Sequence, residues 1–161
     1  MSPRPWAGSP GGAWARAGLV VVAVLAADQL TKALVNASLQ RGEERELIAG
    51  IKLVNTRNSG VAFGQLQDGG TIVAVVIAVA LVALLAYFAR HAAQRLMWLP
   101  TGMLLGGALG NIVDRVREGA VVDFLKLPHW PAFNVADSSI TIGVVILVVV
   151  MERGDRARAT A

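Results

Sequence analysis

The stretch from Thr71 to Phe88 reads TIVAVVIAVALVALLAYF and carries no charged residue in 18 positions. As an α-helix with about 1.5 Å of rise per residue it would span roughly 27 Å, close to the thickness of a bilayer's hydrocarbon core. Similar apolar runs extend from Ala17 to Val35, from Leu96 to Val113 and from Phe133 to Met151. Because lipid offers no partners for backbone N–H and C=O groups, these runs predict an all-α membrane protein with four transmembrane helices.

The composition supports a membrane protein and excludes most soluble classes. Of 161 residues, 55% are hydrophobic and 16% are charged, against roughly 25% charged in typical globular proteins. We expect a single integral membrane domain over residues 1–161, with flexible tails at residues 1–12, rich in Pro, Gly and Ser, and at the arginine-rich residues 153–161.

The absence of cysteine excludes disulfides, thiol nucleophiles, iron–sulfur clusters and cysteine zinc sites. With only two histidines, a multi-histidine metal site is hard to build. The net charge is +4, but the basic residues are scattered between apolar segments. Lipid headgroups and membrane orientation explain this charge better than nucleic acid does.

The positions of lysine and arginine predict the orientation. If both termini are cytoplasmic, the inside segments hold seven basic residues, Arg4, Arg16, Arg90, Arg95, Arg153, Arg156 and Arg158. The outside segments hold seven as well, Arg41, Arg45, Lys52, Arg57, Arg115, Arg117 and Lys126. The inside segments are much shorter, and dense positive charge in short flanks marks the cytoplasmic side. We therefore expect both termini in the cytoplasm.

Two outside segments follow from this topology. The first, residues 40–70, contains the β-prone runs 47–48 and 51–54, separated by Ala49-Gly50, which predicts a small sheet on the outer membrane surface. The second, residues 116–132, is expected to be a loop. It contains Asp123 and also Trp130, which suits the membrane interface.

Polar residues gather at the outer ends of the predicted helices. In the first helix Asp28 and Lys32 are four residues apart, so they share a face and can pair. The third helix ends with Asn111, Asp114 and Arg115 on one face. Charged groups at this depth are costly and are by default a functional-site hypothesis.

The fourth predicted helix adds Asn134 and Asp137 at its outer end, and the preceding loop adds Asp123. Asp123 and Asp137 therefore lie at the depth of the other polar groups. Two carboxylates held close together share a proton, so one can activate a water as general base while the other polarises the scissile carbonyl. An aspartate pair of this kind needs no cofactor.

Other chemistries remain open for this cluster. A serine triad would use Ser138 or Ser139 with His129 and Asp137, although serines at a helix start are also ordinary caps. A Ser–Lys pair would need Lys32, which already has an acidic partner. A metal site would lack histidine ligands and an HExxH motif. Its ligands would be Asp114, Asp123 and Asp137.

Five stretches then point to a known family. They are ADQLTK at 27–32, NSGVAFG at 58–64, GNIVDR at 110–115, VVDF at 121–124 and FNVADS at 133–138. With these stretches, in the family's order over residues 17–151, the chain resembles the bacterial lipoprotein signal peptidases, or signal peptidase II family. The resemblance implies a four-helix membrane bundle with a small extracytoplasmic β-sheet platform and a short outer helix.

The same resemblance implies a membrane aspartic endopeptidase of the bacterial cytoplasmic (inner) membrane, with its active site at the outer face. It would remove the signal peptide from diacylglyceryl-modified prolipoproteins just before the lipidated cysteine, and globomycin would inhibit it. The matching positions for the catalytic residues are Asp123 and Asp137. Matching positions that bind substrate or support the pair are Asn58, Gly60, Asn111, Arg115, Asn134, Asp28 and Lys32.

The supporting residues also have purely structural interpretations. Asp28 with Lys32, and Asp114 with Arg115, can be buried ion pairs that fix helix packing. A stripe of small residues lets the third helix pack closely on a neighbour. This stripe consists of Gly102, Gly106 and Gly110.

The residues of the proposed site have structural counterparts too. Asn58 before Gly60 can form a turn, and Asn134 and Asp137 can cap the fourth helix. The rival functional classes are a small proton or cation transporter, which should place polar groups at successive depths, and a structural assembly factor.

Overall fold

The computed structural model describes residues 10–59 and 69–159. In chain order its elements are α1 (Pro10–Ser38), β1 (Glu44–Ile48), β2 (Ile51–Asn58), α2 (Gly69–His91), α3 (Trp98–Glu118), β3 (Val121–Lys126) and α4 (Val135–Ala159). Each of the four apolar runs forms a helix, as predicted. Within the described ranges, two segments are long and apolar enough to cross a membrane, Gly11–Ser38 and Val135–Gly154.

The first and last helices extend into the regions expected to be tails. α1 begins at Pro10, and proline suits a first turn because its missing N–H has no partner inside the helix. α4 continues to Ala159 through a run of arginines and alanines, which are strong helix formers. Residues 10–12 and 153–159 are therefore helical in the structure.

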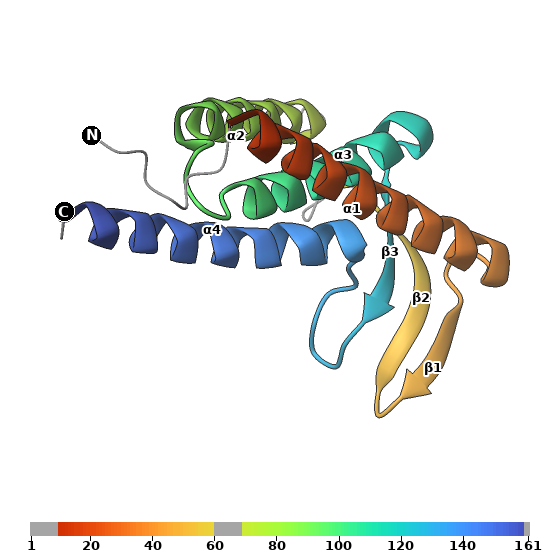
Figure 1. The fold of residues 1–161 in the computed structure, drawn as a ribbon. Coiled ribbons are helices and arrows are strands. Elements are labelled where there is room, and N and C mark those ends of the chain that lie inside the picture. Colours follow the sequence, from red (N-terminus) through yellow and green to blue (C-terminus); the bar gives the residue numbers. More distant parts are fainter. Residues whose placement is uncertain (1–9, 60–68, 160–161) are drawn as a thin grey trace.

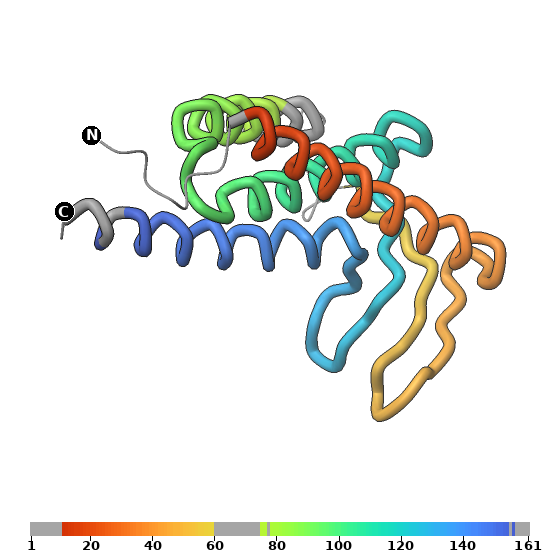
Figure 2. Tube along the Cα trace, in the orientation of Figure 1, coloured from red at the N-terminus to blue at the C-terminus, as the bar shows by residue number. Residues whose placement is uncertain are grey.

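The helices and the sheet occupy different parts of the molecule. α3 packs against α1 and α4, and contacts α2 less extensively. The start of α1 and the end of α4 lie towards the same end of the helices, as the ribbon and the trace both show (Figures 1 and 2). The sheet lies towards the opposite end, with its strands running across the direction of the helices (Figure 1).

Glycines on two sides of α3 permit close helix packing. A Cβ atom at Gly102 would lie 2.6 Å from the Cβ of Val20, and one at Gly106 would lie 2.8 Å from the Cβ of Val24. The predicted small-residue stripe thus packs on α1. Gly107, outside that stripe, faces α4, where a Cβ atom would lie 2.6 Å from the carbonyl oxygen of Ala136.

The sheet has three antiparallel strands in the order β1-β2-β3. The predicted β-prone runs form the β1–β2 hairpin, whose turn has positive φ at Ala49 (49°) and Gly50 (80°). The outer loop expected to contain Asp123 is instead partly a strand, β3. Its valines suit a sheet, and it pairs with β2 so that Asp123 lies opposite Thr56.

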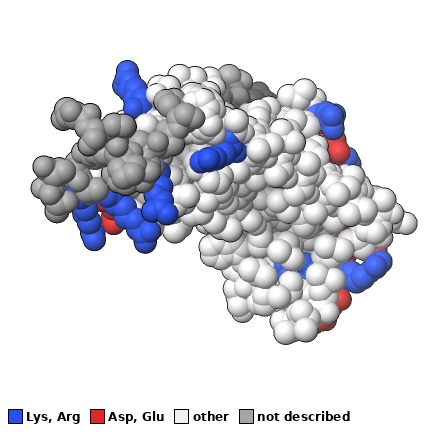
Figure 3. Space-filling model, in the orientation of Figure 1, with Lys and Arg blue, Asp and Glu red and all other residues white. Residues whose placement is uncertain are grey.

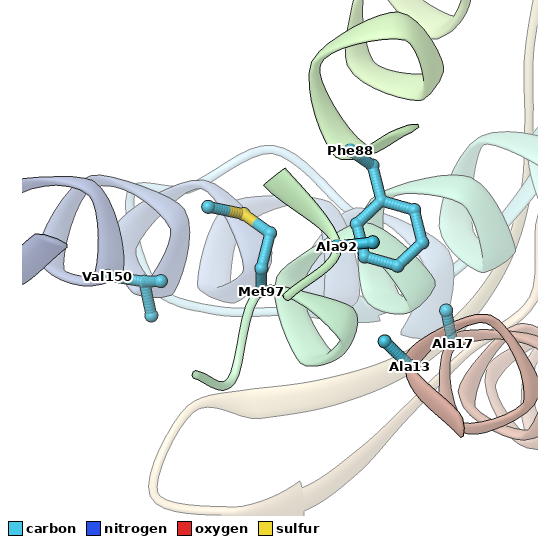
Figure 4. Packing of buried hydrophobic residues seen from close by; sticks show 6 residues of the cluster. All are labelled: Ala13, Ala17, Phe88, Ala92, Met97 and Val150. Carbon is cyan, nitrogen blue, oxygen red and sulfur yellow. The ribbon is translucent and has the colours of Figure 1, made fainter. Parts of the chain in front are cut away.

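A hydrophobic cluster joins the helices at the end away from the sheet. Phe88 of α2 is fully buried and lies near Ala13 and Ala17 of α1 (Figure 4). Trp14 meets the Phe88 ring edge-on, with centroids 4.6 Å apart. The helices nevertheless expose many valines and leucines, and the face in Figure 3 carries few charges between its two ends. This apolar exterior is typical of a lipid-facing surface.

Candidate active site

The start of α4 is closed by reciprocal hydrogen bonds between Asn134 and Asp137. The Asn134 side-chain oxygen accepts the backbone N–H of Asp137 at 2.9 Å, and Asp137 Oδ2 accepts the backbone N–H of Asn134 at 3.2 Å. This is a capping box, in which residues three apart satisfy each other's N–H groups. The predicted capping role is therefore confirmed, and it also fixes the orientation of the Asp137 carboxylate.

Asn134 also joins Asp137 to Asp123. Its side-chain NH₂ group donates to Asp123 Oδ1 at 2.8 Å, so one amide contacts both residues. Asp123 Oδ2 accepts a hydrogen bond from Asn58 of β2 at 3.1 Å, and Asp137 Oδ1 accepts one from Asn111 of α3 at 2.8 Å. The structure thus brings the two aspartates and three of the predicted asparagines together.

The electrostatic environment of Asp123 is unusual for a carboxyl group. Its residue is only 3% exposed, and this burial raises its pKa to about 6, helped by the nearby charge of Asp137. Hydrogen bonds from Asn58 and Asn134 and the charge of Lys32 oppose the rise in pKa. A carboxyl group with a pKa near neutrality can both hold and release a proton at physiological pH.

A buried ion triad, formed by Asp28, Lys32 and Asp114, lies beside the two aspartates. The Lys32 ammonium is 2.7 Å from a carboxylate oxygen of each acid. The predicted Asp28–Lys32 pair is confirmed, but the pairing of Asp114 with Arg115 is wrong. Asp114 faces α1 and binds Lys32, whereas the Arg115 side chain donates to the Asn111 carbonyl oxygen of its own helix at 3.3 Å.

The ion triad contacts the backbone next to both aspartates. Asp28 Oδ1 accepts the N–H of Ala136 at 2.9 Å, and Asp114 Oδ2 accepts the N–H of Val122 at 3.1 Å. Ala136 directly precedes Asp137, and Val122 directly precedes Asp123. Lys32, which binds both acids of the triad, therefore links the two backbone segments that carry the aspartate pair.

Some contacts of the site have no strong signal in the sequence. Gln29 donates to Asp114 Oδ1 at 2.9 Å, and the Thr56 hydroxyl donates to the Asp123 carbonyl oxygen at 3.1 Å. In the sequence, the position of Gln29 next to Asp28 is the signal that could have indicated the contact of Gln29 with Asp114. Gly60, also expected at the site, lies outside the described residues.

The serine and metal alternatives gain no support from the geometry. The Ser138 hydroxyl donates to the Asn134 carbonyl oxygen at 3.0 Å, and the Ser139 hydroxyl donates to the Met103 carbonyl oxygen at 3.0 Å. Both hydroxyl protons are thus bound to backbone. Over residues 10–59 and 69–159, the structure has no group of three or more acidic or histidine side chains placed to hold a metal ion.

Comparison with known proteins identifies the family of this chain. The family model described as signal peptidase (SPase) II matches residues 20–153. The chain belongs to the signal peptidase II family. It is therefore a protease family member whose matched region includes the aspartate pair, the ion triad, α2, α3 and most of α1 and α4.

Individual signal peptidase II relatives match most of the chain. The lipoprotein signal peptidase of Moorella thermoacetica is 42% identical over 131 residues, which cover 80% of this chain and 87% of the relative. That of Geobacter sulfurreducens is 39% identical over 149 residues, covering 87% and 93%. A solved structure described as a bacterial membrane enzyme has a TM-score of 0.77 and 35% identity, covering 84% of this chain and 91% of that one.

Proposed function

We propose that this signal peptidase II family member is an aspartic endopeptidase in which Asp123 and Asp137 are the catalytic pair. Its substrates would be diacylglyceryl-modified prolipoproteins, cleaved just before the lipidated cysteine. The relatives named lipoprotein signal peptidases support a lipoprotein substrate. The observation that carries the mechanism is that the Asn134 side chain donates to the Asp123 carboxylate and accepts the backbone N–H of Asp137.

In the proposed reaction the pair shares one proton, held by Asp123 because burial raises its pKa to about 6. The Asp137 carboxylate takes a proton from a water molecule, whose oxygen attacks the scissile carbonyl carbon, while Asp123 protonates the carbonyl oxygen. When the C–N bond breaks, Asp137 gives its proton to the leaving amine and Asp123 recovers its proton from the former carbonyl oxygen. The pair returns to its starting state, and neither metal nor cofactor takes part.

Residues around the pair would hold the substrate. Arg115 is half-buried on α3 and carries donors suited to a peptide carbonyl. Asn58 is exposed beside Asp123, and Gly60 comes two residues after Asn58 in the sequence. Membrane lipids would surround the bundle, and globomycin would compete for the pair.

We further propose that all four helices cross the bacterial cytoplasmic (inner) membrane, with both termini in the cytoplasm and the sheet on the outer surface. The shared location of the start of α1 and the end of α4 supports this (Figure 1). The chain has no cysteine, so the single substitutions Ser2→Cys and Thr160→Cys each introduce one thiol that can be labelled selectively. We expect a membrane-impermeant thiol reagent to label both only after the cells are opened. Labelling of either in intact spheroplasts would contradict the topology.

The substrate assignment is tested with purified protein in detergent. We expect a diacylglyceryl-modified prolipoprotein to be cleaved just before its lipidated cysteine, and the same precursor without the lipid to be cleaved at least about 100-fold more slowly, because the lipid contributes binding energy that orients the peptide. Mass spectrometry of the products identifies the bond. Absence of cleavage by a folded protein would favour the transporter class and lead to a test for proton-coupled flux.

A further inference from the structure

Arg57 connects the end of β2 to two helices. Its Nε donates to Oε2 of Glu118, the last residue of α3, at 2.9 Å, and its Nη2 donates to Oδ1 of Asn36, in the last turns of α1, at 3.0 Å. The third guanidinium nitrogen, Nη1, donates to Oδ1 of Asn55 in its own strand at 2.7 Å. The Arg57 side chain is only 17% exposed.

Asn55 extends this connection into the protein interior. It is 2% exposed, and its side-chain nitrogen donates at 2.8 Å to the carbonyl oxygen of Leu39, just after α1. Glu118, Asn36 and Asn55 thus each accept a hydrogen bond from a different nitrogen of the Arg57 guanidinium. A planar guanidinium can satisfy such divergent acceptors at once, whereas a lysine ammonium on its flexible stem cannot hold the same geometry.

The residue after Arg57 is Asn58, which donates to Asp123. The β2–β3 pairing changes register between Leu53 and Thr56 and then continues at Thr56, Arg57 and Asn58, so the position of Asn58 depends on the register that this last part of β2 keeps. Since neighbouring residues of a strand point to opposite faces, a slip of one residue would turn Asn58 away from Asp123. An anchor at Arg57 opposes such a slip.

We propose that Arg57 is a positioning residue of the active site: by tying the end of β2 to α1 and α3 it holds Asn58 against Asp123. This inference rests on the proposed function, because it needs Asp123 to be catalytic. Arg57 itself does not touch the reacting atoms. Its effect passes through the side chain of Asn58.

The pH profile of cleavage distinguishes this role from a merely structural one. The pair is active with one proton, so kcat/KM should fall as the pH rises through about 6, where Asp123 loses that proton. The hydrogen bond from Asn58 lowers the pKa of Asp123. Loss of this bond should therefore raise the pKa and move the alkaline limb of the profile to higher pH.

Other charged groups around Asp123 stay in place when Arg57 is changed. Asp137 of α4 raises its pKa and Lys32 of α1 lowers it, while Asp114 of α3 binds the adjacent Val122 N–H. The substitution Arg57→Lys keeps the positive charge. A movement of the limb in this variant would thus report the Asn58 hydrogen bond and not a lost charge.

The experiment compares Arg57→Lys, Asn58→Ala, the double variant and Arg41→Lys. We expect Arg57→Lys and Asn58→Ala each to move the alkaline limb up by about one pH unit and to lower the maximal kcat/KM by roughly 10-fold. The double variant should move the limb no further, because both changes remove one interaction. Arg41 also contacts Glu118, at 3.6 Å, but is 69% exposed, and Arg41→Lys should match the wild type.

The outcomes separate this inference from the proposed function. If Asp123→Asn is inactive, Asn58→Ala moves the limb and Arg57→Lys has the wild-type profile, then the role of Arg57 is wrong and the aspartate pair stands. If Asp123→Asn retains near-normal cleavage, the catalytic pair itself is wrong, and the role of Arg57 fails with it.

Discussion

The substitutions Asp123→Asn and Asp137→Asn are each expected to lower the cleavage rate by about 10²- to 10⁴-fold, the usual contribution of a general acid or base. An asparagine has the shape of an aspartate but can neither take a proton from water nor give one to the substrate. The measurement is the initial rate of cleavage of a lipidated prolipoprotein by each purified variant.

The double variant with Asp123→Asn and Asp137→Asn should be no slower than the slower of the two single variants, because both aspartates take part in the same proton transfers. Both should stay folded. An asparagine at position 137 retains an oxygen that can accept the Asn134 N–H, so the helix cap survives. Thermal unfolding in detergent, with midpoints within a few degrees of the wild type, would show that a lost rate is not a lost fold.

Glu44→Gln is the matched control for these changes. Glu44 is an acid of the sheet that binds Lys52 and Lys126, each at 2.8 Å, and these hydrogen bonds lower its pKa to about 2. It remains ionised throughout the working pH range and has no proton to contribute. Its amide variant should cleave at the wild-type rate. A rate above a tenth of wild type in either aspartate variant would contradict the catalytic pair.

Features set by local spacing could be predicted from the sequence. Hydropathy located all four helices, since each is an apolar run bounded by polar residues. The four-residue spacing of Asp28 and Lys32 placed them on one helix face, and the position of Asn134 and Asp137 at the start of the fourth predicted helix suggested the helix cap. Such contacts depend only on helix geometry, which is the same in every helix.

Contacts between distant elements could not be predicted in the same way. From the sequence, Arg115 was the expected partner of Asp114. In the structure, the rotation of α3 against α1 brings Asp114 to Lys32 instead. Asp123 was expected in a loop, but its neighbours pair with β2, and the irregular register of that pairing decides that Asn58 reaches it. Helix rotation and strand register are settled by packing of the whole chain, and a shift of one residue changes every partner.

Lys32→Met is expected to destabilise the protein more than any surface change. Lys32 is 3% exposed and lies 2.7 Å from both Asp28 and Asp114. Without it, two buried carboxylates lose their cation, and breaking a buried ion pair in this way costs about 3–5 kcal/mol. We therefore expect thermal unfolding in detergent to begin about 10 °C earlier.

A matched control and a rescue identify the cause of that loss. Lys52→Met removes a lysine whose side chain is 42% exposed and pairs with Glu44, and it should leave the unfolding temperature unchanged because exposed ion pairs contribute little. Adding Asp28→Asn and Asp114→Asn to Lys32→Met should restore at least half of the lost stability, because neutral amides need no cation. Failure of this rescue would assign the loss to packing and not to charge.

Cleavage by the rescued variant tests what the ion triad does for the active site. Asp28 and Asp114 hold the N–H groups of Ala136 and Val122, and Lys32 holds the two acids together. The amides of the rescued variant can still accept these N–H groups, but the cation that joins them is gone. If the triad sets the spacing of the catalytic pair, this variant should be stable yet remain roughly 10-fold slower than wild type, because loosened positioning lowers the rate of the chemical step. Full activity would limit the role of the triad to folding.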